Sequence, residues 1–365
     1  MLFYEKELKA LKRAGRYRKR ELFNESLFDL ASNDYLGLSN KKEILQKAYK
    51  RVSNYKEFSP KASMLVNGYH QIHYEFERYI SKRTGFEDTI IVGSGFLANI
   101  SLIEALVRKN DTLFLDEEFH ASGILASKLV KNIKFFKHND SNSLKKELSF
   151  VKKGRKIVAV EGVYSMEGDL LNRDIFDICD QNEALLIVDE AHSSGVLGKN
   201  LLGIYDHYDI TPRQNHIKMA TLGKAAASYG SYISASSHII EYLLNRAKPI
   251  IYSTAPSVFD TALAYESYLH IEKNRDFYTN KRDKLISLAK NIFDIELNSL
   301  ILKIDIADNK KVLKLQEFAK TRGFLIGAIR EPTVKSAIVR IILRLEDDIQ
   351  KIEKFLLEFK EELKK

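Results

Sequence analysis

The fold of this 365-residue chain is indicated by the stretch Leu185-Leu186-Ile187-Val188-Asp189-Glu190-Ala191-His192-Ser193-Ser194-Gly195. Its four consecutive aliphatic side chains predict a strand that is buried on both faces, as the strands of parallel sheets are. An acid, Asp189, follows directly and therefore stands at the carboxyl end of this strand. Open α/β sheets bind their ligands at these carboxyl ends, so Asp189 is the first candidate for a functional residue.

The second candidate is the lysine of Thr221-Leu222-Gly223-Lys224, which follows another short apolar run at residues 217–220. An acid at one strand end and a lysine just past another indicate a site for pyridoxal phosphate. The carboxylate would keep the pyridine nitrogen of the cofactor protonated, and the lysine would carry its aldehyde as a Schiff base.

Strand and helix patterns alternate through the middle of the chain, which favours a mostly parallel sheet wrapped by helices. The expected strands are residues 89–92, 112–115, 133–136, 157–160 and 184–188. Residues 231–236 are expected to form an antiparallel edge strand. We therefore predict the α/β fold class.

The pattern changes after residue 255. Two helical patterns lead to an α+β region with expected strands at 300–304, 324–329 and 338–343. We predict a large domain of residues 40–255 and a smaller domain that combines residues 1–39 with residues 256–365.

Composition points to a cytoplasmic globular protein. Hydrophobic residues make up 45% of the chain and charged residues 29%, and no apolar run has the length of a membrane span. The N-terminal residues lack the layout of a signal peptide. The single cysteine, Cys179, excludes an internal disulfide, and its apolar neighbours predict a buried packing role.

The net charge of +9 has three possible explanations: a nucleic-acid partner, an acidic partner, or a proteome that is rich in lysine. Residues 2–20 form a basic amphipathic helical pattern, either a solvated face or a docking surface for an anionic substrate or carrier. Asp189-Glu190-Ala191-His192 also matches a helicase motif. A helicase needs a Gly-x-x-x-x-Gly-Lys-Ser/Thr loop, but alanine follows Lys224 and Lys218 stands where the first glycine belongs. No nucleic acid is therefore expected.

A phosphate site is expected at Gly93-Ser94-Gly95-Phe96, which lies between a strand and a helix. Backbone N–H groups at a helix N-terminus bind phosphate. A Gly-x-Gly pair alone is equally typical of a plain turn. Thr221, three residues before Lys224, could add a hydroxyl group to the same phosphate.

Further polar residues follow other strand ends. His120 is either a helix-start histidine or a ring stacked on a flat cofactor. His192 is either a buried, satisfied histidine or a contact to the phenolic oxygen of the cofactor. The segment 161–169 adds polar groups at the same sheet edge. Together these strand ends carry phosphate, ring and Schiff-base chemistry in one consistent layout.

With these motifs in hand, the sequence resembles the α-oxoamine synthases, pyridoxal phosphate enzymes of aminotransferase fold type I. The resemblance spans nearly the whole chain, and its matching segments are Ser32–Leu38, Ser94–Asn99, Asp116–Ser122, Glu161–Asp169, Asp189–His192, Thr221–Lys224 and Ile251–Thr254. Residues 328–334 look most like the family members of the biotin pathway.

The resemblance implies a role for each matching residue. Lys224 would carry the cofactor and move the proton at Cα, Asp189 would pair with the pyridine nitrogen, and His120 would stack on the ring. The other implied cofactor contacts are Gly95, Phe96 and Thr221 at the phosphate, Ser165 and His192 near the phenolic oxygen, and Thr254 from a dimer partner. The implied substrate contacts are Asn33 and Arg340 for the amino-acid carboxylate, and Thr333 with Arg18 or Arg20 for the acyl group.

The resemblance also implies a reaction, the decarboxylative condensation of L-alanine with a pimeloyl thioester of coenzyme A or acyl carrier protein. A glycine-using family member, of the 2-amino-3-ketobutyrate ligase or 5-aminolevulinate synthase type, is the alternative. A homodimer is expected, and no metal.

The chain departs from the family at several positions. Residues 59–64 and 225–227 replace glycine-rich segments, the latter Ala-Ala-Ala where Gly-Phe-Gly is usual. The loop before Arg340 is about two residues short, and Ile338 stands where an arginine is frequent. These changes fall mainly on the side of the acyl substrate.

Overall fold

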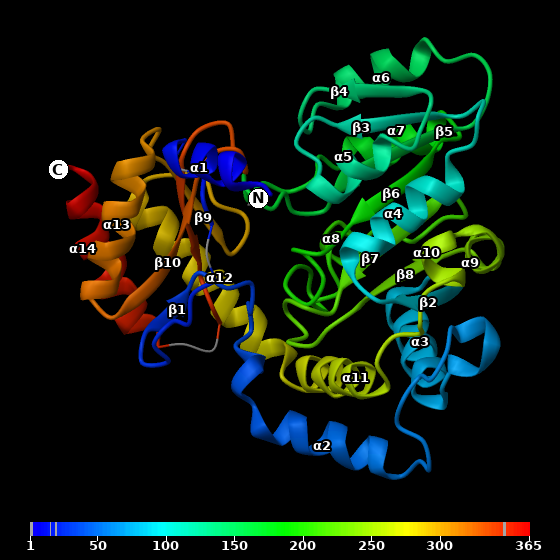
Figure 1. Cartoon of the computed structure of the whole chain (residues 1–365), viewed down its shortest axis with the longest axis horizontal. Coiled ribbons are helices and arrows are strands. Elements are labelled where there is room, and N and C mark those ends of the chain that lie inside the picture. Colours follow the sequence, from blue (N-terminus) through cyan, green and yellow to red (C-terminus); the bar gives the residue numbers. More distant parts are fainter. Residues whose placement is uncertain (1–2, 15, 19, 346–347) are drawn as a thin grey trace. The chain divides into compact units, whose positions relative to one another are not determined.

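The computed structural model describes residues 3–14, 16–18, 20–345 and 348–365. The chain divides into two compact units (Figure 1). The small unit comprises Met1–Asn33, Met166–Gly168 and Asp283–Lys365, and the large unit comprises Asp34–Ser165 and Asp169–Arg282. The large unit therefore begins before residue 40 and extends beyond residue 255, where we had expected its boundaries. The reason is that helix α11 (Val258–Lys273) packs against α2 (Lys42–Ser53) and α3 (Gln71–Thr84).

The large unit is built on a seven-stranded sheet in the order β2-β8-β7-β6-β5-β3-β4 (Figure 1). Its strands are β2 (Asp88–Val92), β3 (Thr112–Asp116), β4 (Ile133–Phe136), β5 (Lys156–Glu161), β6 (Leu185–Asp189), β7 (His216–Thr221) and β8 (Ser231–Ala235). The five strands β4, β3, β5, β6 and β7 are parallel neighbours, as expected. The expectation for β8 was wrong in one respect: it is antiparallel but internal, because β2 pairs with its outer side.

Side chains alternate between the two faces of this sheet. Ile90 and Met219 belong to a core shared with α4 (Gly95–Leu106), whereas their chain neighbours Ile91 and Ala220 pack with α3 and α11. Ile187 of β6 lies on the α4 side. Because the strand period is two residues, Asp189 projects from the same side as Ile187.

The remaining helices of the large unit lie around this sheet. They are α5 (Ala121–Ser127), α6 (Ser141–Ser149), α7 (Asp174–Gln181), α8 (Ile204–His207), α9 (Ser237–Arg246) and α10 (Lys248–Ile251). Helix α7 buries Cys179 completely, which confirms the packing role expected for that residue. Helix α12 (Arg275–Phe293) contains the boundary between the units. Among the described residues, no helix combines the length and apolarity that a bilayer crossing requires.

The small unit contains a four-stranded sheet in the order β1-β10-β11-β9. Its strands are β1 (Phe28–Leu30), β9 (Ile301–Asp305), β10 (Phe324–Ile329) and β11 (Ile338–Ile342), and its further helices are α13 (Asn309–Thr321) and α14 (Ile349–Leu363). The helix expected over residues 2–20 is much shorter than predicted. Helix α1 covers only Glu5–Arg13 and buries no side chain, so no packing extends it further.

A partly buried ionic cluster connects the end of β3 to the segment after β5. His138 bonds to Asp116 at 3.0 Å and to Asp169 at 3.1 Å, and its ring stands edge-on to Tyr164 at 4.4 Å. Tyr164 in turn donates to Asp116 at 2.8 Å. Burial of the ring disfavours its charge, but the bonds and charges of the two carboxylates outweigh burial and raise the pKa of His138 to about 10.

We predict that His138→Gln lowers the free energy of unfolding by about 1–3 kcal/mol at pH 6, because charged hydrogen bonds are lost. The folded pKa exceeds the ordinary value of 6.5, so the stabilisation is complete below pH 6.5 and declines as pH rises toward about 10. Chemical denaturation at several pH values measures this difference. His238→Gln, at an exposed histidine of α9, is the control. A pH-independent difference would contradict the charged state of His138.

Candidate active site

Asp189 is the centre of a hydrogen-bond network at the end of β6. Its side chain is 4% exposed, and its two oxygens accept bonds from Asn99 Nδ2 at 2.8 Å and from the backbone N–H of Ala191 at 2.9 Å. Asn99 lies on α4, which packs over this face of the sheet. These donors stabilise a carboxylate in a place where water is largely excluded.

The network continues from Asn99 to His120. Asn99 Nδ2 also contacts Ser122 Oγ at 2.8 Å, and Ser122 Oγ lies 2.8 Å from His120 Nδ1. His120 is the N-cap of α5 and keeps one side exposed, with the ring of Phe96 edge-on to it. Removal of water from the rest of the ring lowers the pKa of His120; Asp189 opposes this effect and Lys224 adds to it. A neutral imidazole with an open face suits stacking on a flat ring.

The expected phosphate residues come together at the N-terminus of α4. Ser94 caps this helix by accepting the N–H of Leu97. A methyl group added to Gly95 would lie 3.6 Å from Thr221 Cβ, so the end of β7 borders the first turn of α4. Free N–H groups of the first helical turn and the Thr221 hydroxyl are donors suited to a phosphate group.

Lys224 stands in a second chain of polar side chains. Its Nζ lies 2.6 Å from His192 Nε2, and His192 Nδ1 lies 2.6 Å from the hydroxyl of Tyr35. His192 and Tyr35 are buried, at 6% and 1% exposure. Lys224 therefore ends a relay of three side chains that can exchange protons.

The segment after β5 brings Ser165 to the same unit. The backbone N–H of Ser165 donates to Glu161 Oε2 at 3.1 Å, and both residues are buried. Glu161 is paired in register with Asp189 on the neighbouring strand. Thr254 lies exposed between α10 and α11, a position open to a partner subunit.

The small unit holds the substrate residues implied by the resemblance. Arg340 of β11, 5% exposed, donates from both terminal nitrogens to Asn33 Oδ1 at 3.1 Å. Arg18 donates to Thr333 Oγ1 at 2.7 Å. Arg18 and Thr333 line a hollow of about 250 Å³ together with Arg16, Arg330 and Glu331. Arg20, the alternative to Arg18, is an exposed residue outside that lining.

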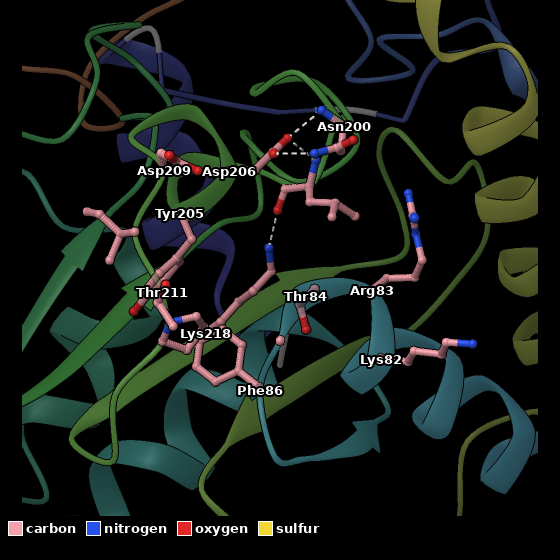
Figure 2. A pocket seen from close by; sticks show the side chains of 14 residues that line it. Lys82, Arg83, Thr84, Phe86, Asn200, Tyr205, Asp206, Asp209, Thr211 and Lys218 are labelled. Atoms are coloured by element: carbon pink, nitrogen blue, oxygen red, sulfur yellow. Dashed lines mark hydrogen bonds between the residues drawn. The ribbon is translucent and has the colours of Figure 1, made fainter.

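Another hollow of the large unit, of about 300 Å³, is separate from these residues (Figure 2). Lys218 of β7 lines it and points to the sheet face opposite Thr221, because the two residues are three positions apart in a strand. Its ammonium group donates to the carbonyl oxygen of Leu202, and the carboxylate of Glu190 lies 3.2 Å away. Lys218 is thus engaged elsewhere, which leaves Lys224 as the candidate for the cofactor.

The arrangement in the large unit fits pyridoxal phosphate. A helix N-terminus suits its phosphate, a buried carboxylate suits its protonated nitrogen, an open imidazole suits its ring, and a half-buried lysine suits its aldehyde. Sequence reasoning had not singled out Asn99 and Tyr35. The one signal for Asn99 is a buried polar residue in an otherwise apolar helix, Gly95–Leu106.

We predict that Asn99→Ala weakens pyridoxal phosphate binding about tenfold, since a hydrogen bond to a charged group is worth about 1.5–3 kcal/mol. Absorbance titration of the cofactor-free protein measures this change. The control is Asn215→Ala, which likewise removes an amide donor to an aspartate, Asp180, away from the site. Equal affinities in wild type and Asn99→Ala would show that the network does not support the cofactor.

Comparison with known proteins agrees with this geometry. The chain matches the family model for class I and II aminotransferases over residues 25–348. It is 43% identical to the 8-amino-7-oxononanoate synthase of Helicobacter pylori (strain ATCC 700392 / 26695) over 352 residues, which cover 95% of this chain and 94% of the relative. A putative 8-amino-7-oxononanoate synthase of Aquifex aeolicus (strain VF5) is 35% identical, with 94% and 93% coverage.

Solved structures show the same fold. The 8-amino-7-oxononanoate synthase of Francisella tularensis matches with a TM-score of 0.78 and 26% identity, covering 93% of this chain and 99% of that one. The serine palmitoyltransferase of S. paucimobilis, solved with pyridoxal phosphate and myriocin bound, matches with a TM-score of 0.86 and 20% identity, at 99% and 98% coverage. The expected fold type I and its cofactor are confirmed. The chain belongs to the class I and II aminotransferase family and, within it, to the pyridoxal phosphate-dependent α-oxoamine synthases.

Proposed function

We propose that this chain condenses L-alanine with a pimeloyl thioester and releases 8-amino-7-oxononanoate, CO2 and a free thiol, a step of biotin biosynthesis. The alanine Cα forms a bond to the acyl carbon, the thiol leaves, and the bond from Cα to the carboxylate breaks. Coenzyme A and acyl carrier protein are the two candidate thioester carriers. The observation that carries the proposal is the 43% identity over 95% of the chain to a synthase of this name.

The cofactor, when bound, supplies an electron sink for the charge that develops at Cα. We assign Asp189 to the pyridine nitrogen, because its donors from Asn99 and Ala191 keep the carboxylate charged and fixed. Gly95 and Thr221 border the helix end that would receive the phosphate.

The remaining cofactor contacts are assigned by the family resemblance and are consistent with the positions of the residues. His120 presents an open face for ring stacking, with Phe96 beside it. Ser165 and His192 would approach the phenolic oxygen. Thr254 would reach the phosphate of a partner subunit.

Lys224 would take the proton from Cα, for which its amine must be neutral. His192 Nε2 lies 2.6 Å from Lys224 Nζ and is backed by the Tyr35 hydroxyl. This relay gives the lysine a partner with which to exchange a proton during the reaction, and it fixes the position of the amine.

The two substrates carry carboxylates, and the small unit supplies arginines for both. Arg340, buried and aligned by Asn33, would bind the alanine carboxylate through its two terminal nitrogens. Arg18, bound to Thr333, would bind the free carboxylate at the far end of the pimeloyl chain.

We also propose a homodimer located in the cytoplasm. Exposed large apolar side chains on the large unit, Phe58 at 71%, Val66 at 77% and Tyr252 at 80%, support the dimer. Their segments lie together, because the N–H of Ala255 donates to the carbonyl of Ala62 at 2.9 Å. Exposed apolar side chains on neighbouring segments favour association.

The test of the proposed function is a competition among amino acids. Purified protein with pimeloyl-coenzyme A and equal amounts of alanine, glycine and serine is expected to yield 8-amino-7-oxononanoate as the main product by mass spectrometry. A glycine-derived main product would establish the rival, a glycine-using synthase.

The loading of the enzyme is verified independently of turnover. Borohydride reduction followed by peptide mapping should place a pyridoxyl group on Lys224. Lys218 is the internal control and should carry none, because it is bound to Glu190 and Leu202. A loaded enzyme that makes no product would overturn the proposed substrates and leave the cofactor assignment standing.

We predict that Arg18→Ala raises the KM for pimeloyl-coenzyme A about tenfold to a hundredfold, since one charge-assisted pair is lost. Arg20→Ala, the matched control, should change it less than about twofold. Heptanoyl-coenzyme A, which lacks the free carboxylate, should respond equally to both variants. Steady-state kinetics with the two thioesters measure the difference, and a larger effect of Arg20→Ala would reverse the assignment.

A further inference from the structure

Glu161 is a second buried acid beside Asp189, and the mechanism has not used it. It is the last residue of β5 and pairs in register with Asp189, the last residue of the parallel strand β6. Parallel neighbours in register project their side chains from the same face, about 5 Å apart. The two residues are 2% and 4% exposed. Two carboxyl groups this close and this buried cannot both be charged at low cost.

The hydrogen bonds decide which of the two carries the charge. Both oxygens of Asp189 accept N–H bonds, from Asn99 and from Ala191. Glu161 Oε2 accepts the Ser165 N–H, but Oε1 is buried and lacks a hydrogen-bond partner among the described residues. A charged carboxylate oxygen that is buried without a hydrogen-bond partner raises the free energy of the folded protein. A protonated, neutral carboxyl group avoids the cost of burying the charge.

Electrostatics point the same way. Burial first, and then the charge of Asp189, raise the pKa of Glu161 well above its usual range, although Lys224 and the N–H of Ser165 oppose the shift. The charged or titratable groups that face Glu161 are Asp189, Lys224 and Tyr164, whose own pKa is raised, mainly by burial. The negative charge of the pair therefore belongs to Asp189.

Glu161 also fixes the segment that follows its own strand. Its Oε2 accepts the backbone N–H of Ser165, four residues later in the chain. The side chain at the end of β5 thus holds the serine that is assigned to the cofactor.

We propose that Glu161 is a positioning residue whose neutral carboxyl group holds the Ser165 segment and leaves the negative charge of the acid pair on Asp189. This role rests on the proposed function only in requiring that the enzyme uses pyridoxal phosphate. It does not depend on which amino acid or thioester reacts.

Two substitutions separate the charge of Glu161 from its hydrogen bonds. Glu161→Gln keeps the shape and the acceptor but is always neutral, whereas Glu161→Leu removes the acceptor. Glu77→Gln is the control, since Glu77 is another buried acid, 6% exposed, that accepts a backbone N–H from Ile91. The measurements are the midpoint of the visible absorbance change of the lysine-bound cofactor with pH, and the dissociation constant of pyridoxal phosphate.

Glu161→Gln and Glu77→Gln are both expected to keep the wild-type absorbance midpoint, and Glu161→Gln to keep the cofactor affinity within about threefold. Glu161→Leu should weaken cofactor binding about tenfold, because the N–H of buried Ser165 loses its acceptor. Glu161→Gln should thus keep the cofactor affinity that Glu161→Leu loses. If Glu161 only filled space, both variants would bind the cofactor about equally well.

Two results would overturn the proposal. A midpoint lowered by about one pH unit or more in Glu161→Gln would show that a negative charge had been removed near Lys224, hence that Glu161 is ionised. Wild-type cofactor affinity in Glu161→Leu would show that the bond to Ser165 does not position the cofactor site. If Glu161→Leu does not fold, the infrared carbonyl band of a protonated carboxyl group decides. Wild type should have this band and Glu161→Gln should lack it, so the Glu161→Gln minus wild-type spectrum should show it as a negative band. Absence of the band from wild type would refute the neutral state.

Discussion

The structure of the site depends on keeping one carboxylate charged inside the protein. Asp189 ends a strand whose preceding residues, Leu186 to Val188, are at most 1% exposed, so water cannot solvate it. Unpaired buried charge is costly, and the chain meets this cost with N–H donors from Asn99 and Ala191. Each donor must be held in turn, which is why Ser122 and His120 follow in the same network. A fixed polar environment of this kind needs no rearrangement when charge moves during a reaction.

The polar groups of the large unit form two hydrogen-bond chains with different tasks. One runs from Asp189 through Asn99 and Ser122 and ends at a histidine whose pKa is lowered. This chain stabilises a fixed negative charge on Asp189. The other runs from Lys224 through His192 to Tyr35 and consists of groups that can each give or take a proton. Separation of the two chains would let a proton move at the lysine without disturbing Asp189, the carboxylate that we assign to the pyridine nitrogen of the cofactor.

Much of this arrangement could be predicted from the sequence, because the parallel sheet brings the carboxyl ends of β5, β6 and β7 to one edge. Asp189 and Lys224 were predicted for that reason. Asn99 and Tyr35 were not, since their partnerships depend on how a helix and a loop are rotated over the sheet. The interior position of β8 could not be predicted from the hydrophobic pattern either. Strand order is set by which strands pair, and periodicity does not specify this pairing. The end of α1 was missed because a helical pattern without packing does not fix a helix length.

The alanines at residues 225–227, where the family usually has Gly-Phe-Gly, are accommodated by contacts within the large unit. Gly195, at the end of the stretch that indicated the fold, has φ 84°, and a Cβ there would lie 2.6 Å from Ala225 Cβ. The small residue in one segment therefore admits the alanine in the other. Ala227 adopts φ 47°, a left-handed conformation that costs a non-glycine residue about 1–2 kcal/mol. Alanines in place of glycines also reduce the backbone freedom of this turn, so the segment after Lys224 is stiffer than a glycine-rich turn would be.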